Sequence, residues 1–432
     1  METKQNPVTL WLTRIVIYIV LTGFAIFMLF PFIYMVMTSL KTSNDVFHYP
    51  PRLLPYTPEM REYNGELVPV YSITVDGQQR EMVLTGEKVD FGFFTTETLV
   101  NVDSPRESEI LADIPLDEAV ATGEVVTLTR SNGNTREFDV YEVMIDGEPQ
   151  RLLLAFKGKK DVFIDPDNPE IVAYEFARTA TLAEVIDFQF QNYVRVFIGD
   201  DQVQENSDNP ALNTSVSLST KLDRSLVNTT IVTLGVTVGQ LVTSIFGGYA
   251  FARIPFKGRN TLFIMYLGSI MIPFVVLIIP MYRLMVAIGW QNKLVSLIVP
   301  WIFTAYGTFL MRQFFLSIPK EIEEAALLDG ASRMRILWTI FVPLSKPAIA
   351  TLAIFSFLYA WNSFLWPLLI IGEGNEANHV LTLSLIRLSN AAADQPNIVL
   401  TGAAIAILPP VIVFVLAQRY FIEGVATSGL KG

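Results

Sequence analysis

The residues best suited to do chemistry in this sequence are acidic, and they lie in one charged segment, residues 317–347, between two long apolar runs. The acids closest together are Glu321, Glu323, Glu324 and Asp329. Carboxylates at this spacing can accept charge-assisted hydrogen bonds from the arginines of a partner protein. The alternative is that they are the solvated charges of an amphipathic loop at a membrane surface.

A second group of polar and aromatic residues interrupts an apolar run at the stretch YAWNSFLW. Its members are Tyr359, Trp361, Asn362 and Ser363. Aromatic faces beside amide and hydroxyl groups suit the CH faces and hydroxyls of a sugar, and polar groups inside a membrane span often mark a solute path. We predict a substrate path here, near the middle of the span. The alternative is that Asn362 and Ser363 only join helices by hydrogen bonds.

Composition and motifs exclude several kinds of chemistry. The chain has no cysteine, which rules out disulfides, thiolate metal sites and thiol nucleophiles. It also lacks the phosphate loop GxxxxGKS or GxxxxGKT and the motifs GxSxG, HExxH and GxGxxG. We therefore predict no catalytic residue, no cofactor-binding residue, no metal ligand and no nucleic-acid partner. Without a phosphate loop the chain should not hydrolyse nucleotide itself, so its energy must come from elsewhere.

Composition also places most of the chain in a lipid bilayer. Of its 432 residues, 51% are hydrophobic and 17% are charged, whereas a soluble protein carries about 25% charge. Six apolar runs are long enough to cross hydrocarbon as helices, near residues 15–38, 227–251, 261–288, 294–316, 349–371 and 398–417. The sequence therefore predicts an all-α polytopic membrane protein with six transmembrane helices.

The positions of lysine and arginine predict that both termini are cytoplasmic. Lys4 and Arg14 flank the start of the first run, and the basic stretch RIPFKGR follows the second. The charged segment is the next basic loop, and the tail QRYFIEGVATSGLKG ends the chain. The remaining loops are short or acidic and are expected on the outside.

Residues 42–222 depart from the membrane pattern. Residues 42–220 hold 32 Asp and Glu against 13 Lys and Arg, a net charge of −19, which leaves 10 acids and 18 bases, a net charge of +8, for the rest. Runs of β-branched and aromatic residues broken by Asp-Gly and Asn-Gly predict hairpins. We predict a mostly β extracytoplasmic insert between residues 1–41, which hold the first helix, and residues 223–432, a five-helix core.

Local signals predict a helix, a turn and a second helix within the charged segment. Ser317 and Pro319 are typical of a helix start, and the glutamates after them suit the positive end of the helix dipole. Gly330 predicts the end of this helix, since glycine readily adopts the left-handed conformation. Ser332 is the expected cap of the second helix, which should end before Pro343.

The spacing of the charged segment resembles the EAA loop of ABC-importer permeases. Glu324-Ala325-Ala326 is followed after three residues by Gly330, and nine further residues separate Gly330 from Ile340. The family pattern then continues as I-x-L-P, and here Val342 replaces the leucine before Pro343. The stretches FGGYAFARIPFKGR and WNSFLWPLLI and the C-terminal tail also resemble carbohydrate permeases of the maltose-transporter class. The resemblance covers the first span and residues from about 190 onward, and it does not cover the β insert.

This resemblance implies the fold of a type I ABC importer permease in a bacterial inner or plasma membrane. Its expected partners are a second, homologous permease, two ABC ATPase subunits and an extracytoplasmic sugar-binding protein. The resemblance also assigns roles to six residues: polar contacts to the ATPase for Glu323, Glu324 and Asp329, a close-packed face for Ala325 and Ala326, and a turn for Gly330. The tail would reach between the ATPase subunits.

The substrate and two other functional classes remain open at this stage. A sugar of the oligosaccharide or α-glucoside class is the predicted substrate, and another small solute such as glycerol 3-phosphate is the alternative. A channel or sensor with an extracellular β domain would leave the EAA spacing unexplained. An exporter subunit is disfavoured because the EAA loop is typical of importers.

Overall fold

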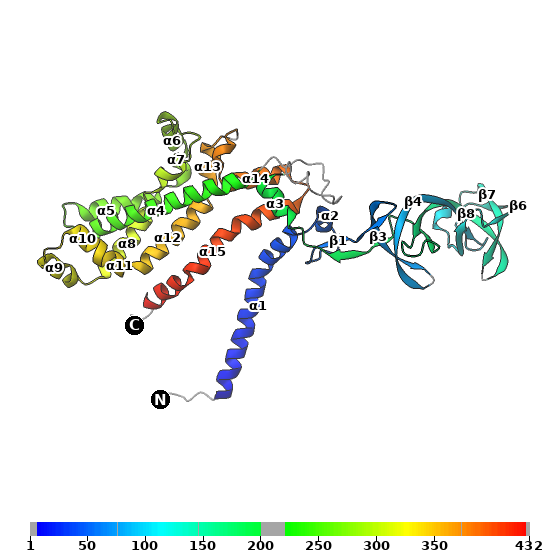
Figure 1. Ribbon diagram of the computed structural model, residues 1–432, viewed down its shortest axis with the longest axis horizontal. Helices are drawn as coiled ribbons and strands as arrows, with labels where there is room; N and C mark the ends of the chain where they lie inside the picture. The colour runs from blue at the N-terminus through cyan, green and yellow to red at the C-terminus, as the bar shows by residue number, and fades with distance from the viewer. Residues whose placement is uncertain (1–6, 76, 146, 200–220, 373, 429–432) are drawn as a thin grey trace. The chain divides into compact units, whose positions relative to one another are not determined.

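The computed structural model in Figure 1 describes residues 7–75, 77–145, 147–199, 221–372 and 374–428. The chain divides into two compact units, Met1–Pro55 with Phe188–Gly432 and Tyr56–Asp187. The first unit is helical and the second is β, which confirms a β-rich N-terminal region followed by a helical C-terminal region. Lys4 and residues 200–220 of the predicted insert lie outside the described residues.

The β unit is an antiparallel sheet of hairpins. Its strands are β1 (Tyr56–Pro58), β2 (Met60–Tyr63), β3 (Glu66–Val75), β4 (Gln78–Thr95), β5 (Ala112–Pro115), β6 (Val120–Thr129), β7 (Thr135–Ile145), β8 (Glu148–Ile164), β9 (Val172–Glu175), β10 (Thr181–Leu182) and β11 (Glu184–Ile186). The main sheet runs β10-β3-β4-β8-β7-β6, with β2, β5 and β9 paired to β3, β4 and β8. β1 pairs with β11, so the first and last strands of the unit lie side by side.

The turns of these hairpins confirm the glycine signals in the sequence. Asn64 and Gly65, between β2 and β3, have φ values of 54° and 83°. Gly77 and Gly147, each just after an aspartate, have φ values of 76° and 83°. Glycine and asparagine tolerate this left-handed region, so the turns need no strained side chain.

Two of the hairpins are versions of one pattern, which sequence inspection missed. The β3–β4 hairpin contains VYSITVDG and the β7–β8 hairpin contains VYEVMIDG. Their registers correspond, since Val70 pairs with Val83 and Val140 pairs with Leu153. Each hairpin builds its own small core, with Met82 in the first and Val143 in the second. The β unit therefore has enough internal apolar packing to form a folded domain.

The helical unit contains long helices joined by short helical pieces. They are α1 (Pro7–Ser39), α2 (Ser43–Val46), α3 (Gln191–Ile198), α4 (Asp223–Arg253), α5 (Arg259–Gly268), α6 (Phe274–Ala287), α7 (Val295–Ile298), α8 (Ala305–Ser317), α9 (Lys320–Leu328), α10 (Arg333–Ile336), α11 (Val342–Leu344), α12 (Lys346–Trp361), α13 (Leu365–Ile370), α14 (Leu381–Ala391) and α15 (Pro396–Ser428). The remainder of the C-terminal tail, residues 429–432, lies outside the described residues.

Among the described residues, three helices are long and apolar enough to cross a membrane unbroken: Trp11–Ser39 within α1, α4, and Pro396–Gln418 within α15. Three bent pairs also pass the test, namely Arg259–Met271 with α6, Val295–Trp301 with α8, and Arg333–Leu344 with α12. These pairs bend by 97°, 40° and 81°. The number of spans is six only if each bent pair counts as one, so the predicted six remains a prediction.

The bends lie at residues that stop or start helices. Pro273 begins α6 and Pro347 lies in the first turn of α12, where a proline's missing N–H is tolerated. The predicted run 349–371 is also interrupted, because α12 ends at Trp361 and α13 begins at Leu365. Asn362 and Ser363 therefore lie at a helix end, whereas the prediction put them near the middle of a span.

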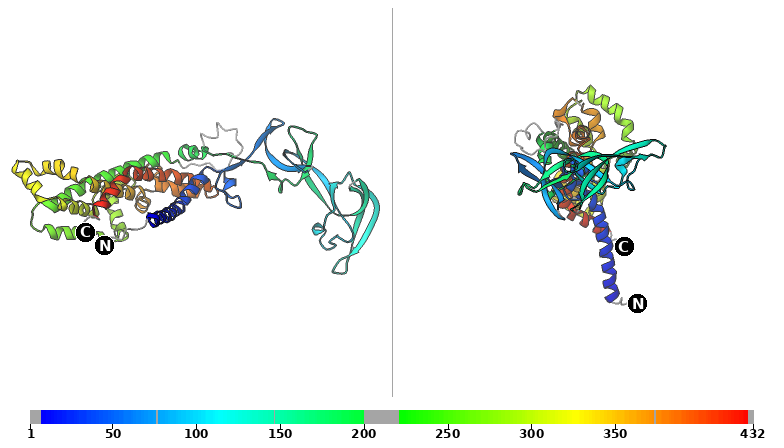
Figure 2. Two further views of the ribbon diagram at one scale, coloured as in Figure 1. Left: turned by 90° about the horizontal axis from the view of Figure 1, so that it is seen from below. Right: turned by 90° about the vertical axis from the view of Figure 1, so that its right-hand side faces the viewer.

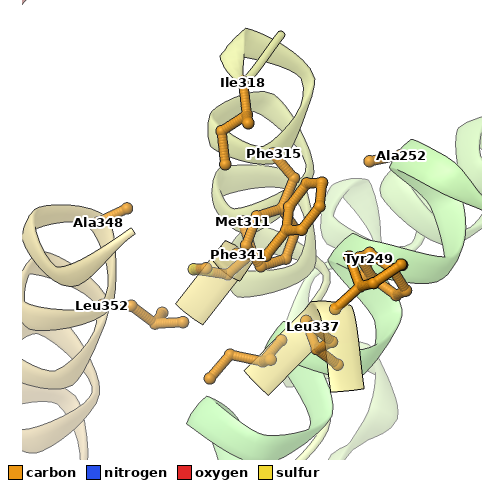
Figure 3. Close-up of a cluster of buried hydrophobic side chains, with 11 residues drawn as sticks. Tyr249, Ala252, Met311, Phe315, Ile318, Leu337, Phe341, Ala348 and Leu352 are labelled. Atoms are coloured by element: carbon orange, nitrogen blue, oxygen red, sulfur yellow. The ribbon is translucent and has the colours of Figure 1, made fainter. Parts of the chain in front are cut away.

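Helix α4 is central to the packing of the helical unit. It lies alongside α8 and α12, as the views in Figures 1 and 2 show. Gly235 and Gly239 lie close to the segment before α8, since a Cβ at Gly239 would lie 2.4 Å from a side-chain carbon of Ile302. These two glycines therefore serve close packing. At one end of α4, the buried cluster in Figure 3 joins Tyr249 to Phe315 and other side chains of α8 and α12.

The β unit, Tyr56–Asp187, is shorter than the predicted insert, residues 42–222, because the segments that flank it belong to the helical unit. Lys41 is buried and pairs with Asp45 at 3.5 Å, both after the end of α1. Asn192 of α3 donates hydrogen bonds to the backbone oxygens of Ser39 and Lys41, each at 2.9 Å. These bonds tie the chain before the β unit to the chain after it.

Candidate functional site

The charged segment folds as predicted into a short helix closed by a glycine turn. After α9, Gly330 has a φ of +80°, and the N–H of Ala331 donates to the backbone oxygen of Ala326 at 3.0 Å. This is the Schellman arrangement that ends many helices. Ser332 then accepts a hydrogen bond from the N–H of Arg335 at 3.3 Å, which confirms it as the cap of α10.

Two boundaries of the charged segment differ from the prediction. Ser317 is the last residue of α8 and not the start of α9, and its hydroxyl donates to the backbone oxygen of Phe314 at 2.7 Å. The second helix does not end before Pro343, because α10 continues through a π-helical turn, Leu337–Phe341, into α11. Pro343 is the second residue of α11, and its missing N–H removes one backbone hydrogen bond from this continuous helical stretch.

Four of the six predicted coupling residues face outward: Glu324, Ala325, Asp329 and Gly330. Leu328 beside them is 89% exposed, an unusual environment for a leucine at a helix end. Ala326 instead is half-buried and packs against the internal apolar cluster. The exposed surface of α9 thus combines a carboxylate, a small side chain and a protruding apolar one.

Glu323, the remaining predicted residue, is turned toward the protein's own helices. One carboxylate oxygen accepts from the hydroxyl of Tyr249 at 3.3 Å and from Arg333 at 3.2 Å. The other lies 3.6 Å from the guanidinium of Arg253. The side chain is only 9% exposed. The prediction grouped Glu323 with the contacts to a partner protein, but in this structure its partners belong to α4 and α10.

The predicted substrate-path residues lie where α12 ends. Tyr359 is half-exposed, while Trp361 is buried and donates its indole N–H to the backbone oxygen of Ala406 in α15 at 3.0 Å. Asn362 forms the C-terminal cap position of α12 and donates to the backbone oxygen of Leu358 at 2.9 Å. Its amide therefore serves the helix end.

Three of these four residues line one small cavity, and Asn362 is not among them. Its lining comprises Thr229, Val232, Val236, Leu297, Trp301, Tyr359, Ala360, Trp361, Ser363, Trp366, Pro367 and Val380. The cavity is very small: the centre of a water molecule could occupy only about 10 Å³ of it, so it holds one water at most. A sugar could enter only after the helices around the cavity separate.

Sequence inspection missed a polar connection within the bundle. Gln240 of α4 is buried, donates to the backbone oxygen of Trp301 at 2.8 Å and accepts from the hydroxyl of Ser356 at 2.6 Å. An amide in an apolar span is itself a signal, because burying it without partners would be costly. The hydrogen bond to Ser356 joins α4, which lines the cavity, to α12.

Among the residues that the structure describes, no group of three or more His, Asp or Glu could hold a metal ion. The expected lack of a metal ligand and of a cofactor stays a prediction.

Comparison with known proteins places this arrangement in a transport family. Residues 241–427 match the family described as the binding-protein-dependent transport system inner membrane component. The chain is 36% identical over 203 residues to the sn-glycerol-3-phosphate transport system permease protein UgpE of Pectobacterium atrosepticum. That alignment covers 72% of the relative and 47% of this chain. The chain belongs to this family.

Two further similarities accompany this permease. It is 37% identical over 205 residues to the arabinooligosaccharides transport system permease protein AraQ of Halalkalibacterium halodurans, covering 73% of that relative and 48% of the chain. A bacterial ABC transporter involved in alginate import has a solved chain with a TM-score of 0.44 and 24% identity, covering 81% of that chain and 55% of this one.

The family assignment confirms the ABC-importer permease that the EAA spacing predicted, and with it an inner-membrane location. The matched residues 241–427 include α9, α12 and most of α15. They leave out the β unit, Tyr56–Asp187, which is an addition to the region that defines this permease family.

Proposed function

We propose that this permease belongs to an ATP-driven importer and that α9 is where ATPase subunits dock. The observation that carries this proposal is the surface of α9, where Glu324, Ala325 and Leu328 are exposed beside the turn at Gly330. A carboxylate offers charge-assisted bonds to basic groups of a groove, and a small neighbour lets the groove approach closely. ATP is then bound by the partner subunits and not by this chain.

The proposed complex contains this permease, a second homologous permease, two ABC ATPase subunits and an extracytoplasmic sugar-binding protein. The distribution of Lys and Arg supports cytoplasmic positions for both termini and for α9. The same orientation puts the β unit outside, between α1 and α4. In this arrangement α9 and the β unit contact different partners.

The proposed substrate is a sugar of the oligosaccharide or α-glucoside class. Aromatic residues of the cavity, including Trp301, Tyr359 and Trp366, support a ligand with apolar ring faces, while Ser363 supplies a hydroxyl. Glycerol 3-phosphate is an alternative of comparable weight, since one relative is named for that solute and another for arabinooligosaccharides. A channel or sensor is the weaker alternative, because neither requires a docking helix such as α9.

The docking role of α9 is tested by reversing one exposed charge. We expect Glu324→Lys to insert normally and to lose its ATPase subunits, because a lysine would repel the basic groups that a glutamate attracts. The measurement is the amount of ATPase that co-purifies with the permease from membranes. Glu66→Lys, an exposed change in the β unit, is the matched control and should retain the ATPase. Normal co-purification with Glu324→Lys would refute this docking role.

A further inference from the structure

A buried polar network connects the short helix α9 to the end of the long helix α4. At its centre is Glu323, which contacts Tyr249 and Arg253 of α4 and Arg333 of α10. The side chain of Arg253 is 4% exposed. Removing one partner of an ion pair this well shielded from water leaves the other charge buried and uncompensated, which is strongly destabilising.

Arg253 also holds the end of α8. Its Nη2 donates to the backbone oxygen of Phe315 at 2.6 Å and to that of Ile318. Its guanidinium lies 5.0 Å from the centre of the Phe341 ring, which belongs to the π-helical turn after α10. One side chain at the end of α4 therefore contacts the end of α8, the π-helical turn and Glu323 of α9.

Helix α9 needs such contacts to keep its orientation. It has nine residues, and helices this short are marginal without tertiary packing. Its exposed surface includes Glu324 and Leu328, so its internal contacts come from the other side, where Glu323 and Ala326 lie. Of these two, only Glu323 brings charge-assisted bonds, which fix direction as well as distance.

Helix α4 leads from this network to the cavity. Thr229, Val232 and Val236 line the cavity, and Arg253 is the last residue of the same helix. The distance along the helix from Thr229 to Arg253 is roughly 36 Å at 1.5 Å per residue. Because α4 is unbroken over this length, a displacement of its end is carried to the cavity lining.

We infer that Glu323 and Arg253 are positioning residues that make α9 and α4 move as one body, so that force applied to α9 reaches the cavity. Glu323 is then an internal connection, distinct in role from the exposed Glu324. The part of this inference that concerns ATP rests on the proposed function, whereas the joint movement of α9 and α4 does not.

The joint movement is tested on the permease alone in lipid nanodiscs. Because the chain lacks cysteine, spin labels can be placed uniquely at Lys320→Cys in α9 and Val227→Cys in α4, both exposed. We expect Glu323→Gln to broaden the distance distribution between the labels and to speed amide exchange in α9 about tenfold, as loss of charge-assisted bonds implies. Glu321→Gln, an exposed change on the same helix, should alter neither measurement.

Two further variants separate positioning from general misfolding. Glu323→Asp keeps the charge and should restore part of the narrow distribution. Arg333→Gln removes a partner that is 42% exposed, so it should fold and broaden the distribution less than Glu323→Gln. A distribution that stays as narrow in Glu323→Gln as in the unsubstituted chain overturns the inference.

The transmission of force is tested in the complex with ATPase subunits. A cysteine replaces Ser363 in the cavity, and its rate of reaction with a soluble maleimide is measured with and without ATP. We expect ATP to change this rate in the otherwise unsubstituted complex and in Glu321→Gln. In Glu323→Gln the ATPase should remain bound while the rate no longer responds to ATP.

The two proposals fail in different ways. If no ATPase binds even the unsubstituted permease, the proposed function is wrong, and the spin-label measurement still decides whether Glu323 joins α9 to α4. If the ATPase binds and Glu323→Gln responds to ATP as fully as Glu321→Gln, docking stands and transmission through Glu323 is wrong.

Discussion

At the scale of single residues, neighbours in the sequence have opposite environments. Glu323 is buried among Tyr249, Arg253 and Arg333, while Glu324 is exposed. The two side chains point in different directions because successive residues of a helix are about 100° apart around its axis. The two glutamates therefore have different proposed roles: Glu323 bonds within the permease, and Glu324 contacts a partner protein.

Gly330 offers a graded test at this scale. We expect Gly330→Ala to destabilise the turn by about 1 kcal/mol, because an L-residue at φ +80° is strained while a Cβ there meets nothing within 4 Å. Gly330→Pro should do far more damage, since proline cannot adopt positive φ and loses the N–H that donates to Leu327 at 3.1 Å. Amide exchange in α9 and retention of the ATPase measure both effects.

The control for this pair is Gly268→Ala, a glycine whose added Cβ also meets nothing within 4 Å and whose φ is −60°. It should leave α9 unchanged. Full retention of the ATPase by both Gly330→Ala and Gly330→Pro would show that the left-handed turn does not matter to docking.

At the scale of elements, the helical unit depends on how closely α4 approaches its neighbours. A Cβ at Gly239 would lie 2.4 Å from Ile302, closer than real side chains come, and a Cβ at Gly235 would lie 3.1 Å from Ile298, a tight contact. The side-chain amide of Gln240 in the same helix donates to the backbone oxygen of Trp301, between α7 and α8, and accepts from the hydroxyl of Ser356 in α12. Packing and buried hydrogen bonds together keep the cavity closed.

A larger side chain at this contact should open the bundle. We expect Gly239→Val to lower the melting temperature of the permease in detergent by several degrees, because overpacking of this kind costs roughly 1–3 kcal/mol. Gly23→Val in α1, where an added Cβ meets nothing within 4 Å, is the matched control and should leave the melting temperature nearly unchanged. A similar small shift for both variants would contradict the close-packing role of Gly239.

At the scale of the whole molecule, the unusual feature is the β unit within a membrane permease. It has its own cores, and its first and last strands pair, with Tyr56 opposite Ile186. Paired neighbours in such a ladder are about 5 Å apart, so the unit can be removed without stretching the chain. The net charge of −19 over residues 42–220 gives this region a field that could steer a basic surface of a binding protein.

Excision of residues 56–187, replaced by a short Gly/Ser linker, tests what the β unit does. If it docks the binding protein, the complex should assemble and its ATPase should lose stimulation by that protein. Before excision, the stimulation should weaken as salt is raised, because exposed charges are screened. Full stimulation after excision shows that the docking role is wrong, and failure of assembly favours a role in holding the partner permease.

The sequence by itself determined features that depend on local chemistry. Apolar runs located the long helices, although α1 begins earlier, at Pro7, and α15 extends further, to Ser428. Glycine after a helix or between strands specified left-handed turns at Gly65 and Gly330. The EAA spacing identified the family, because the offsets between residues of one short helix and its turn can be read directly from the sequence. All of these signals act over a few residues and need no distant partner.

Only the tertiary structure decided which groups meet. Nothing local distinguishes Glu323 from Glu324, and the partners Arg253 and Arg333 come from different helices. Likewise, Asn362 has the chemistry of a ligand contact, but the end of α12 uses its amide for a backbone carbonyl, while Trp301 reaches the cavity from another part of the chain. Burial and pairing depend on long-range packing, which the order of residues does not display.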